Sequence, residues 1–192
     1  MQERKQEESV VMEKKLRQKW GDLIQIGLRL AGVGASIAGA CLMFTCHQTA
    51  LVYGVPMDAK YGYASAFKFF AFANAIASVL ALMSLSLTLM LWRHRVEATN
   101  HHFFFFLHDL GVTALLLSGC SAATAIGYVG KHGNSHAGWV PICDHFSSFC
   151  HRAMAAIGLS YFSFLSFLFL TVLSAAKYST PQFAPLQVQS SI

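Results

Sequence analysis

The sequence predicts an all-α membrane protein, a four-transmembrane-helix bundle with both termini in the cytoplasm. Apolar residues make up 55% of the 192 residues and charged residues 12%, which is about half the charged share of an ordinary soluble domain. Four apolar segments, residues 23–46, 66–92, 103–130 and 153–176, exceed the roughly 20 residues that a helix needs to cross a bilayer. Barrel strands are only about 10 residues long, so we expect the segments to be helices.

The apolar segments divide the chain into regions of different composition. Residues 1–22 are polar and mixed in charge, and we expect a cytoplasmic N-terminal arm there. The first apolar run starts late and carries an arginine, which favours a retained helix over a signal peptide. Residues 23–176 form the predicted four-helix membrane domain. Within it, residues 47–65 and 131–152 are predicted outer loops and residues 93–102 a short cytoplasmic connection, and residues 177–192 follow as a cytoplasmic tail.

The distribution of Lys and Arg gives the expected orientation, because cytoplasmic loops carry the excess of these residues. Most of them lie in the N-terminal arm, the 93–102 connection and the start of the tail, whereas the outer side holds Lys60, Lys68, Lys131 and Arg152. The net charge of +5 lies largely on these membrane flanks. Anionic lipid head groups are therefore expected partners, and nucleic acid is not.

Two charges of opposite sign, Arg29 and Asp109, lie inside apolar segments, where an ionised side chain is expensive. Each is six positions past the start of its segment, so at about 1.5 Å per residue both lie ~9 Å along their helices. Both helices are expected to run outward, which places the two side chains at one depth as an intramembrane ion pair. The alternatives are independent snorkelling of Arg29, a protonated Asp109, and a proton or ion pathway.

Small residues recur at four-residue spacing in the first apolar segment, a pattern that lets membrane helices approach closely. We interpret this ladder as helix packing within the bundle, with a self-association face as the alternative. Serines of the fourth segment are able to bond across helices or to their own helix carbonyls. The ladder consists of Gly27, Ala31, Ala35 and Gly39, with Gly32, Ser36 and Ala40 beside it, and the serines are Ser160, Ser163 and Ser166.

Cys143 and Cys150 share the second outer loop, where an oxidising environment allows disulfides to persist. In a straight helix their α-carbons would lie ~10 Å apart, too far for a bridge, so the predicted disulfide requires the segment to bend back on itself. Two free thiols or a metal site are the alternatives. The histidines of this loop do not match a zinc-ligand spacing, so no metal and no cofactor is expected.

Sequence motifs for catalysis do not stand out in this chain. It contains no GxSxG, HExxH, P-loop or dinucleotide-binding pattern. A buried Asp paired with an Arg is poor material for acid–base chemistry, because the pair holds both groups in their charged forms. We therefore expect a protein that is not an enzyme.

The motifs along the membrane region resemble those of a plant family, the casparian strip membrane domain proteins and their CASP-like relatives, which are related to MARVEL-type four-helix proteins. The resemblance spans the whole membrane region and is strongest to the first subgroup of CASP-like proteins. The motifs are Leu28-Arg29-Leu30, Ala73-Asn74-Ala75-Ile76-Ala77, His108-Asp109, Ser121-Ala122-Ala123-Thr124-Ala125 and Trp139-Val-Pro-Ile-Cys143-Asp-His-Phe146-Ser-Ser-Phe149-Cys150.

This resemblance implies a multi-pass protein of the plasma membrane that forms homo- and hetero-oligomers with related four-helix proteins. The founding members build a membrane scaffold that limits lateral diffusion and localises cell-wall enzymes, so secreted cell-wall enzymes are implied partners. We expect a non-enzymatic scaffold; the alternative is a small transporter, channel or proton-coupled subunit that uses Arg29 and Asp109. The first outer loop, around Met57 to Tyr63, departs from the founding members' signature.

Overall fold

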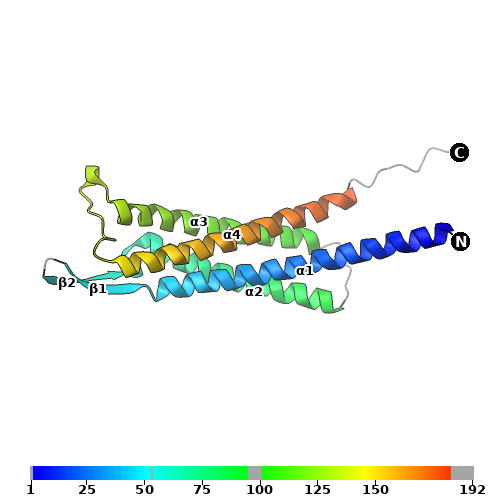
Figure 1. The fold of residues 1–192 in the computed structure, drawn as a ribbon, viewed down its shortest axis with the longest axis horizontal. Helices are drawn as coiled ribbons and strands as arrows, with labels where there is room; N and C mark the ends of the chain where they lie inside the picture. Colours follow the sequence, from blue (N-terminus) through cyan, green and yellow to red (C-terminus); the bar gives the residue numbers. More distant parts are fainter. Residues whose placement is uncertain (1, 53, 95–100, 183–192) are drawn as a thin grey trace.

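The computed structural model describes residues 2–52, 54–94 and 101–182, and four long antiparallel helices make up most of this part (Figure 1). Each is long and apolar enough to cross a membrane, so the predicted class, a mostly helical four-span bundle, is confirmed. The helices are α1 (Gln2–Phe44), α2 (Ser65–His94), α3 (His101–His132) and α4 (Ser147–Gln182).

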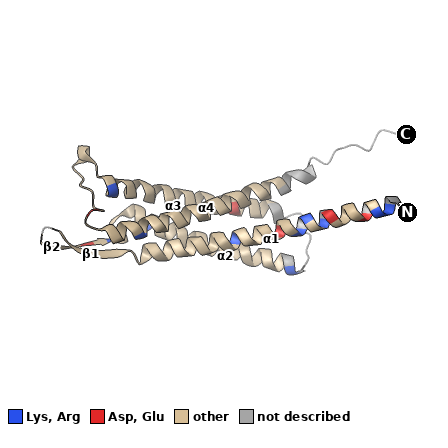
Figure 2. Cartoon of the chain, in the orientation of Figure 1, with Lys and Arg blue, Asp and Glu red and all other residues tan. Residues whose placement is uncertain are grey.

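Two helices, α1 and α4, begin well before the residues that the sequence predicts. The first starts at Gln2, so the residues expected to form a separate arm continue α1. Their Glu, Lys, Arg and Gln side chains are good helix formers, and Glu13 pairs with Arg17 at 3.6 Å across one turn. The fourth helix starts at Ser147, six positions before the predicted residue 153. Charges gather on the first part of α1, and only isolated ones interrupt the middle of the bundle (Figure 2).

The first connection contains a β-hairpin where the sequence predicts only an outer loop. Strands β1 (His47–Val52) and β2 (Val55–Lys60) pair antiparallel, with Val52 opposite Val55. Gly54 adopts φ +81° in the turn, a backbone conformation that glycine adopts without steric penalty. The 3-10 turn η1 (Tyr61–Tyr63) leads into α2. Gln48 Oε1 accepts a hydrogen bond of 2.7 Å from the Phe149 backbone N–H, which fixes the hairpin to the start of α4.

The helices form a ring in which α1 and α3 each pack on both α2 and α4. The hairpin and the connection between α3 and α4, which contains the short turn η2 (Ser135–Ala137), lie together at one end (Figure 1). We call this the hairpin end, and the opposite end, where α1 begins and α4 stops, the terminal end. One hydrophobic cluster lies near the hairpin end around Phe70 and Met43. A second, around Leu116 and Phe167, lies toward the terminal end.

Candidate functional site

Arg29 and Asp109 lie side by side inside the bundle, although their helices occupy opposite corners of the ring. Arg29 Nη1 donates to Asp109 Oδ1 at 2.8 Å and Nη2 to Oδ2 at 2.6 Å. Such a two-pronged pairing matches the planar guanidinium to the carboxylate. Arg29 is 4% exposed and Asp109 0%. The structure thus pairs the two residues that the sequence places at equal depth.

Ser84 of α2 and the ring of Phe105 complete the surroundings of the guanidinium. Ser84 of α2 accepts a second hydrogen bond from Arg29 Nη1 at 2.6 Å, so the pair also holds α2. The Arg29 guanidinium carbon lies 5.3 Å from the ring centroid of Phe105, within the range of a cation–π interaction. The backbone carbonyl of Asp109 accepts from Thr113, which in turn lies 3.4 Å from Thr171 of α4. We call this set the charged clasp.

The charged clasp is suited to holding helices together. Taking two charges out of water costs several kcal/mol, and only good geometry with added hydrogen bonds offsets that cost. Here both carboxylate oxygens of Asp109 accept from Arg29. Within the described residues, His108 Nε2 is the buried side-chain polar atom without a partner, while its Nδ1 lies 3.5 Å from Asp109 Oδ1.

A second polar layer crosses the other diagonal of the ring, between α2 and α4. Asn74 Oδ1 accepts from Ser160 Oγ at 2.6 Å, and Asn74 Nδ2 donates to the Phe70 carbonyl at 2.9 Å. Ser163 Oγ donates to the Gly32 carbonyl of α1 at 2.8 Å. We call this set the amide layer.

The serines of α4 therefore divide between the two bonding modes that the sequence leaves open. Ser160 and Ser163 bond across helices, whereas Ser166 donates to the Phe162 carbonyl of its own helix at 2.9 Å. A sequence signal for Asn74 exists, since an amide inside an apolar segment requires partners. Ser84 and Phe105 carry no such signal.

The small-residue ladder of α1 does not lie on one face of the bundle. Ala35 and Gly39 are buried, and a Cβ on Gly39 would meet the Ala156 carbonyl oxygen at 3.1 Å. Gly27 and Ala31 are exposed, and no atom outside the helix backbone lies within 4 Å of a Cβ on Gly27. Four residues advance a helix by about 40° beyond a full turn. The ladder therefore rotates from the outside of the bundle into its core.

Cys143 and Cys150 form a disulfide in the structure, with their α-carbons 5.7 Å apart. The bend that this bridge requires lies just before α4, which starts at Ser147. Cys143 precedes the helix and Cys150 lies in its first turn, so the bridge ties the α3–α4 connection to α4. Among the other cysteines, Cys41 is exposed while Cys46 and Cys120 are buried.

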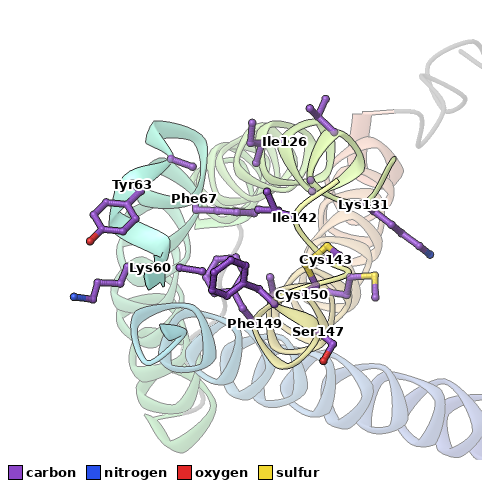
Figure 3. A pocket seen from close by; sticks show the side chains of 18 of the residues that line it. Lys60, Tyr63, Phe67, Ile126, Lys131, Ile142, Cys143, Ser147, Phe149 and Cys150 are labelled. Atoms are coloured by element: carbon purple, nitrogen blue, oxygen red, sulfur yellow. A yellow bond between two sulfur atoms is a disulfide. The ribbon is translucent and has the colours of Figure 1, made fainter. Parts of the chain in front are cut away.

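A cavity of about 780 Å³ opens at the hairpin end, between β2, the start of α2, the end of α3 and the start of α4. Figure 3 shows the Phe67, Phe149 and Ile142 side chains at its centre, whereas Lys60 and Lys131 extend outward on opposite sides. No sequence pattern indicates this cavity, because it arises where the hairpin and the disulfide-bridged loop face each other. No group of three or more possible metal-ligand side chains comes together in the described part of the chain.

Electrostatics at the cavity rim are set by Asp58. Thr49 Oγ1 donates to Asp58 Oδ1 at 2.7 Å across the hairpin, and Lys60 Nζ lies 3.1 Å from Oδ2. The hydrogen bond from Thr49 is the largest cause that lowers the pKa of the Asp58 carboxyl, and the hydrogen bond from Lys60 is the second. The contact with Asp58 in turn raises the pKa of Lys60. Both groups are thus favoured in their charged forms.

Comparison with known proteins identifies the chain's family. Residues 18–166, which include the charged clasp's Arg29 and Asp109 and both bridged cysteines, match the Casparian strip membrane protein domain. The CASP-like protein 1F1 of Vitis vinifera is 47% identical over 152 residues, covering 79% of this chain and 73% of the relative. The CASP-like protein 1F1 of Populus trichocarpa is 44% identical over 154 residues, covering 80% and 84%.

More distant relatives carry the same name. The CASP-like protein 1F1 of Arabidopsis thaliana is 37% identical over 153 residues, covering 80% of this chain and 88% of the relative. No solved structure matches the chain significantly. The resemblance drawn from the motifs, including its first subgroup, is confirmed. The chain belongs to the family of the Casparian strip membrane protein domain, among the CASP-like multi-pass membrane proteins of plants that group with subfamily 1F.

Proposed function

We propose that this chain is a non-enzymatic scaffold of the plasma membrane that self-associates into membrane domains. In such domains it organises cell-wall-modifying partners or forms a diffusion barrier. Both termini are cytoplasmic in this proposal, which agrees with the excess of Lys and Arg at the terminal end. A disulfide at the hairpin end supports the same orientation, because disulfides persist outside the cytosol.

The observation that carries the proposal is the outward face of α1. Small residues follow one another along it at alternating spacings of four and three, on the side of the helix opposite Arg29 and the core. Each is exposed or half-buried, and no atom outside the helix backbone lies within 4 Å of a Cβ built on either glycine. This face consists of Gly27, Ala31, Gly34, Ala38 and Cys41.

Small side chains on a lipid-facing side of a helix stabilise packing only when another helix packs against them. Small residues allow two helix backbones to approach closely, and van der Waals contact then drives association in the bilayer. The inward polar groups of the bundle are already used by the charged clasp and the amide layer. The outward face of α1 is therefore the part of the molecule that favours a second copy.

Cysteine crosslinking in native membranes tests this proposal. Cys41 lies on the outward face of α1, while Cys46 and Cys120 are buried, so oxidation with copper phenanthroline is expected to produce a dimer through Cys41. Non-reducing electrophoresis detects the dimer, and Cys41→Ser is expected to abolish it. The same variant combined with Ile76→Cys, at an exposed position of α2, is the matched control and is expected to stay monomeric.

Imaging of the tagged protein tests the scaffold role itself. We expect slow lateral exchange after photobleaching in plant plasma membrane, and faster exchange for Gly34→Leu, which enlarges the outward face. Proximity labelling from the same membrane is expected to recover related four-helix proteins and secreted cell-wall enzymes. Free diffusion of a strictly monomeric protein, without a Cys41 dimer, would contradict the proposal.

A further inference from the structure

The cavity at the hairpin end has no part in the charged clasp, the amide layer or the outward face of α1. Its volume of about 780 Å³ lies within the range of about 300–1,000 Å³ typical of small-molecule sites. Its walls are formed by the β-hairpin with the start of α2, by the end of α3, and by the disulfide-bridged loop with the start of α4 (Figure 3).

The chemistry of the walls is apolar. Phe67, Ile126, Ile142 and Phe149 line the interior, and Figure 3 shows the polar ends of the labelled Tyr63, Lys60, Lys131 and Ser147 side chains directed away from its centre. A water molecule in a stable position needs two to four polar partners, which such walls do not supply. An apolar ligand is the occupant that the walls favour.

Basic residues near the cavity indicate its expected depth in the membrane. Lys131 is the next-to-last residue of α3, and Arg152 lies five residues past the start of α4. Basic residues near the ends of membrane helices typically meet lipid head groups. Ile126 and Ile157, which line the cavity, are each five residues further into the bundle, or ~7.5 Å along their helices. The floor of the cavity is thus at the depth of acyl chains, and its mouth at the depth of head groups.

Charge at the mouth favours an anionic head group. Lys60 is engaged by Asp58 at 3.1 Å. Lys131 lines the cavity and has no ion-pair partner in the part of the chain that the structure describes. A free ammonium group beside an apolar cavity complements an amphiphile that carries a negative head and an apolar chain.

We propose that this cavity binds the acyl chain of one anionic lipid from the leaflet at the hairpin end, with its head group beside Lys131. The lipid would fill the space between the hairpin and the disulfide-bridged loop. It would add a contact between these two elements, which the hydrogen bond between Gln48 and Phe149 already joins. The site is independent of self-association through α1.

Photolabelling of the purified full-length protein tests this site. The probe is a C18 fatty acid that carries a diazirine midway along its chain, added to the protein in nanodiscs of neutral phosphatidylcholine. We expect saturable labelling of peptides that contain Ile126, Ile142 or Phe149, and loss of this labelling when unlabelled oleate competes. Mass spectrometry of the digested protein identifies the labelled residues.

A cavity-filling variant and a matched control on the same helix make the test specific. Gly127 lines the cavity, and a Cβ there meets only Ile157 Cδ1, at 3.9 Å, so Gly127→Leu has room. It is expected to reduce cavity labelling by about tenfold, because the leucine side chain occupies the volume of several chain methylenes. Gly111→Leu, at an exposed position of α3 with open space around it, is expected to label normally. If Gly127→Leu fails to fold, Ile142→Trp in the loop replaces it.

Charge provides the second arm of the test. Lys131→Gln is expected to weaken labelling by the fatty acid several-fold and to leave labelling by the matching fatty alcohol unchanged, since the alcohol lacks the negative head. Labelling spread evenly over exposed helix faces, without competition by oleate, would mean a lipid annulus only and would overturn the proposal. Crosslinks from the cavity to a second copy or to the chain's own tail would also overturn it, by identifying another occupant.

Discussion

At the scale of single residues, the charged clasp follows from the cost of charge in hydrocarbon. Asp109 has a side chain too short to reach head groups from its depth, and Arg29 is the oppositely charged residue at the same depth. The pairing was therefore predictable from the sequence. Ser84 was not, because a helix serine bonds equally well to its own carbonyls, as Ser86 and Ser118 do. Only the packed structure decides which serine faces a partner.

Removing one member of the pair is expected to destabilise the protein strongly. Arg29→Ala leaves the buried Asp109 without its partner, and an uncompensated buried charge costs ~3–5 kcal/mol. We expect a lower melting temperature in detergent and retention before the plasma membrane. Arg17→Ala, which breaks an exposed pair with Glu13, is the control and should change stability by less than about 1 kcal/mol.

The charge-swapped double variant of Arg29 and Asp109 tests whether the ion pair itself, or the identity of the residue at each position, stabilises the protein. Exchange of the two residues restores opposite charges at one depth and is expected to recover part of the lost stability and trafficking. Normal folding, trafficking and assembly of Arg29→Ala would show that the pair is not structural. Flux that is lost in Asp109→Asn while the protein stays folded would instead favour a transport role.

Asp58 is expected to make the stability of the hairpin fall in acid and stay constant around neutral pH. Its pKa is lowered below the ordinary value of 3.8, first by the Thr49 hydrogen bond and then by Lys60. A carboxyl with a depressed pKa stabilises the fold at pH values above its unfolded pKa, and this contribution is lost as the pH falls through the folded pKa. We expect no change in the hairpin between about pH 5 and 8 and loosening below about pH 4.

Carboxyl ¹³C chemical shifts of Asp58 measure this titration directly. Thr49→Val removes the main cause and is expected to raise the pKa of Asp58 toward its ordinary value, whereas Thr45→Val, whose hydroxyl bonds only carbonyls of α1, should leave it in place. An unshifted pKa in the unmodified protein would contradict the cross-strand hydrogen bond.

At the scale of elements, helix existence was predictable and helix ends were not. Length and hydropathy identify the four spans, since they depend only on bilayer thickness. The start of α1 depends on helix propensity in polar residues, which a hydropathy pattern ignores. The hairpin was missed because its strands are short and their alternation is weak. The cavity was missed because it depends on how two loops face each other.

The different surroundings of two glycines of α1 predict opposite effects of substitution. Gly39→Ala places a Cβ 3.1 Å from the Ala156 backbone oxygen, so α4 must shift, and a loss of ~1–3 kcal/mol is expected. Gly34→Ala meets nothing within 4 Å, and the better helix propensity of alanine is expected to stabilise the protein slightly. Thermal unfolding in one detergent compares them. Equal effects would mean that Gly39 does not face α4.

At the scale of the whole molecule, the two polar layers cross the two diagonals of the ring. The charged clasp joins α1 to α3, and the amide layer joins α2 to α4. Neighbouring helices of the ring pack directly. Opposite helices make too few contacts to fix their relative positions along the bundle axis. One polar bridge across each diagonal supplies that constraint. The Arg29–Asp109 pair and the Asn74–Ser160 hydrogen bond lie at the levels of Arg29 and Gly39, ten residues or ~15 Å apart along α1. The Ser163 hydrogen bond to Gly32 lies between these two levels.

Because sites more than about 7–10 Å apart without shared partners act independently, the two layers are expected to contribute additively. Asn74→Ala and Ser84→Ala should sum in the double variant to within about 0.5 kcal/mol. The effects of Asp109→Asn and Ser84→Ala should not be additive, since both substitutions remove a partner of the Arg29 guanidinium. Unfolding of single and double variants in matched micelles measures both cycles. A coupling above about 1 kcal/mol between Asn74 and Ser84 would contradict independent layers. It would mean that the charged clasp and the amide layer belong to one connected polar network, through which the loss of one layer weakens the other.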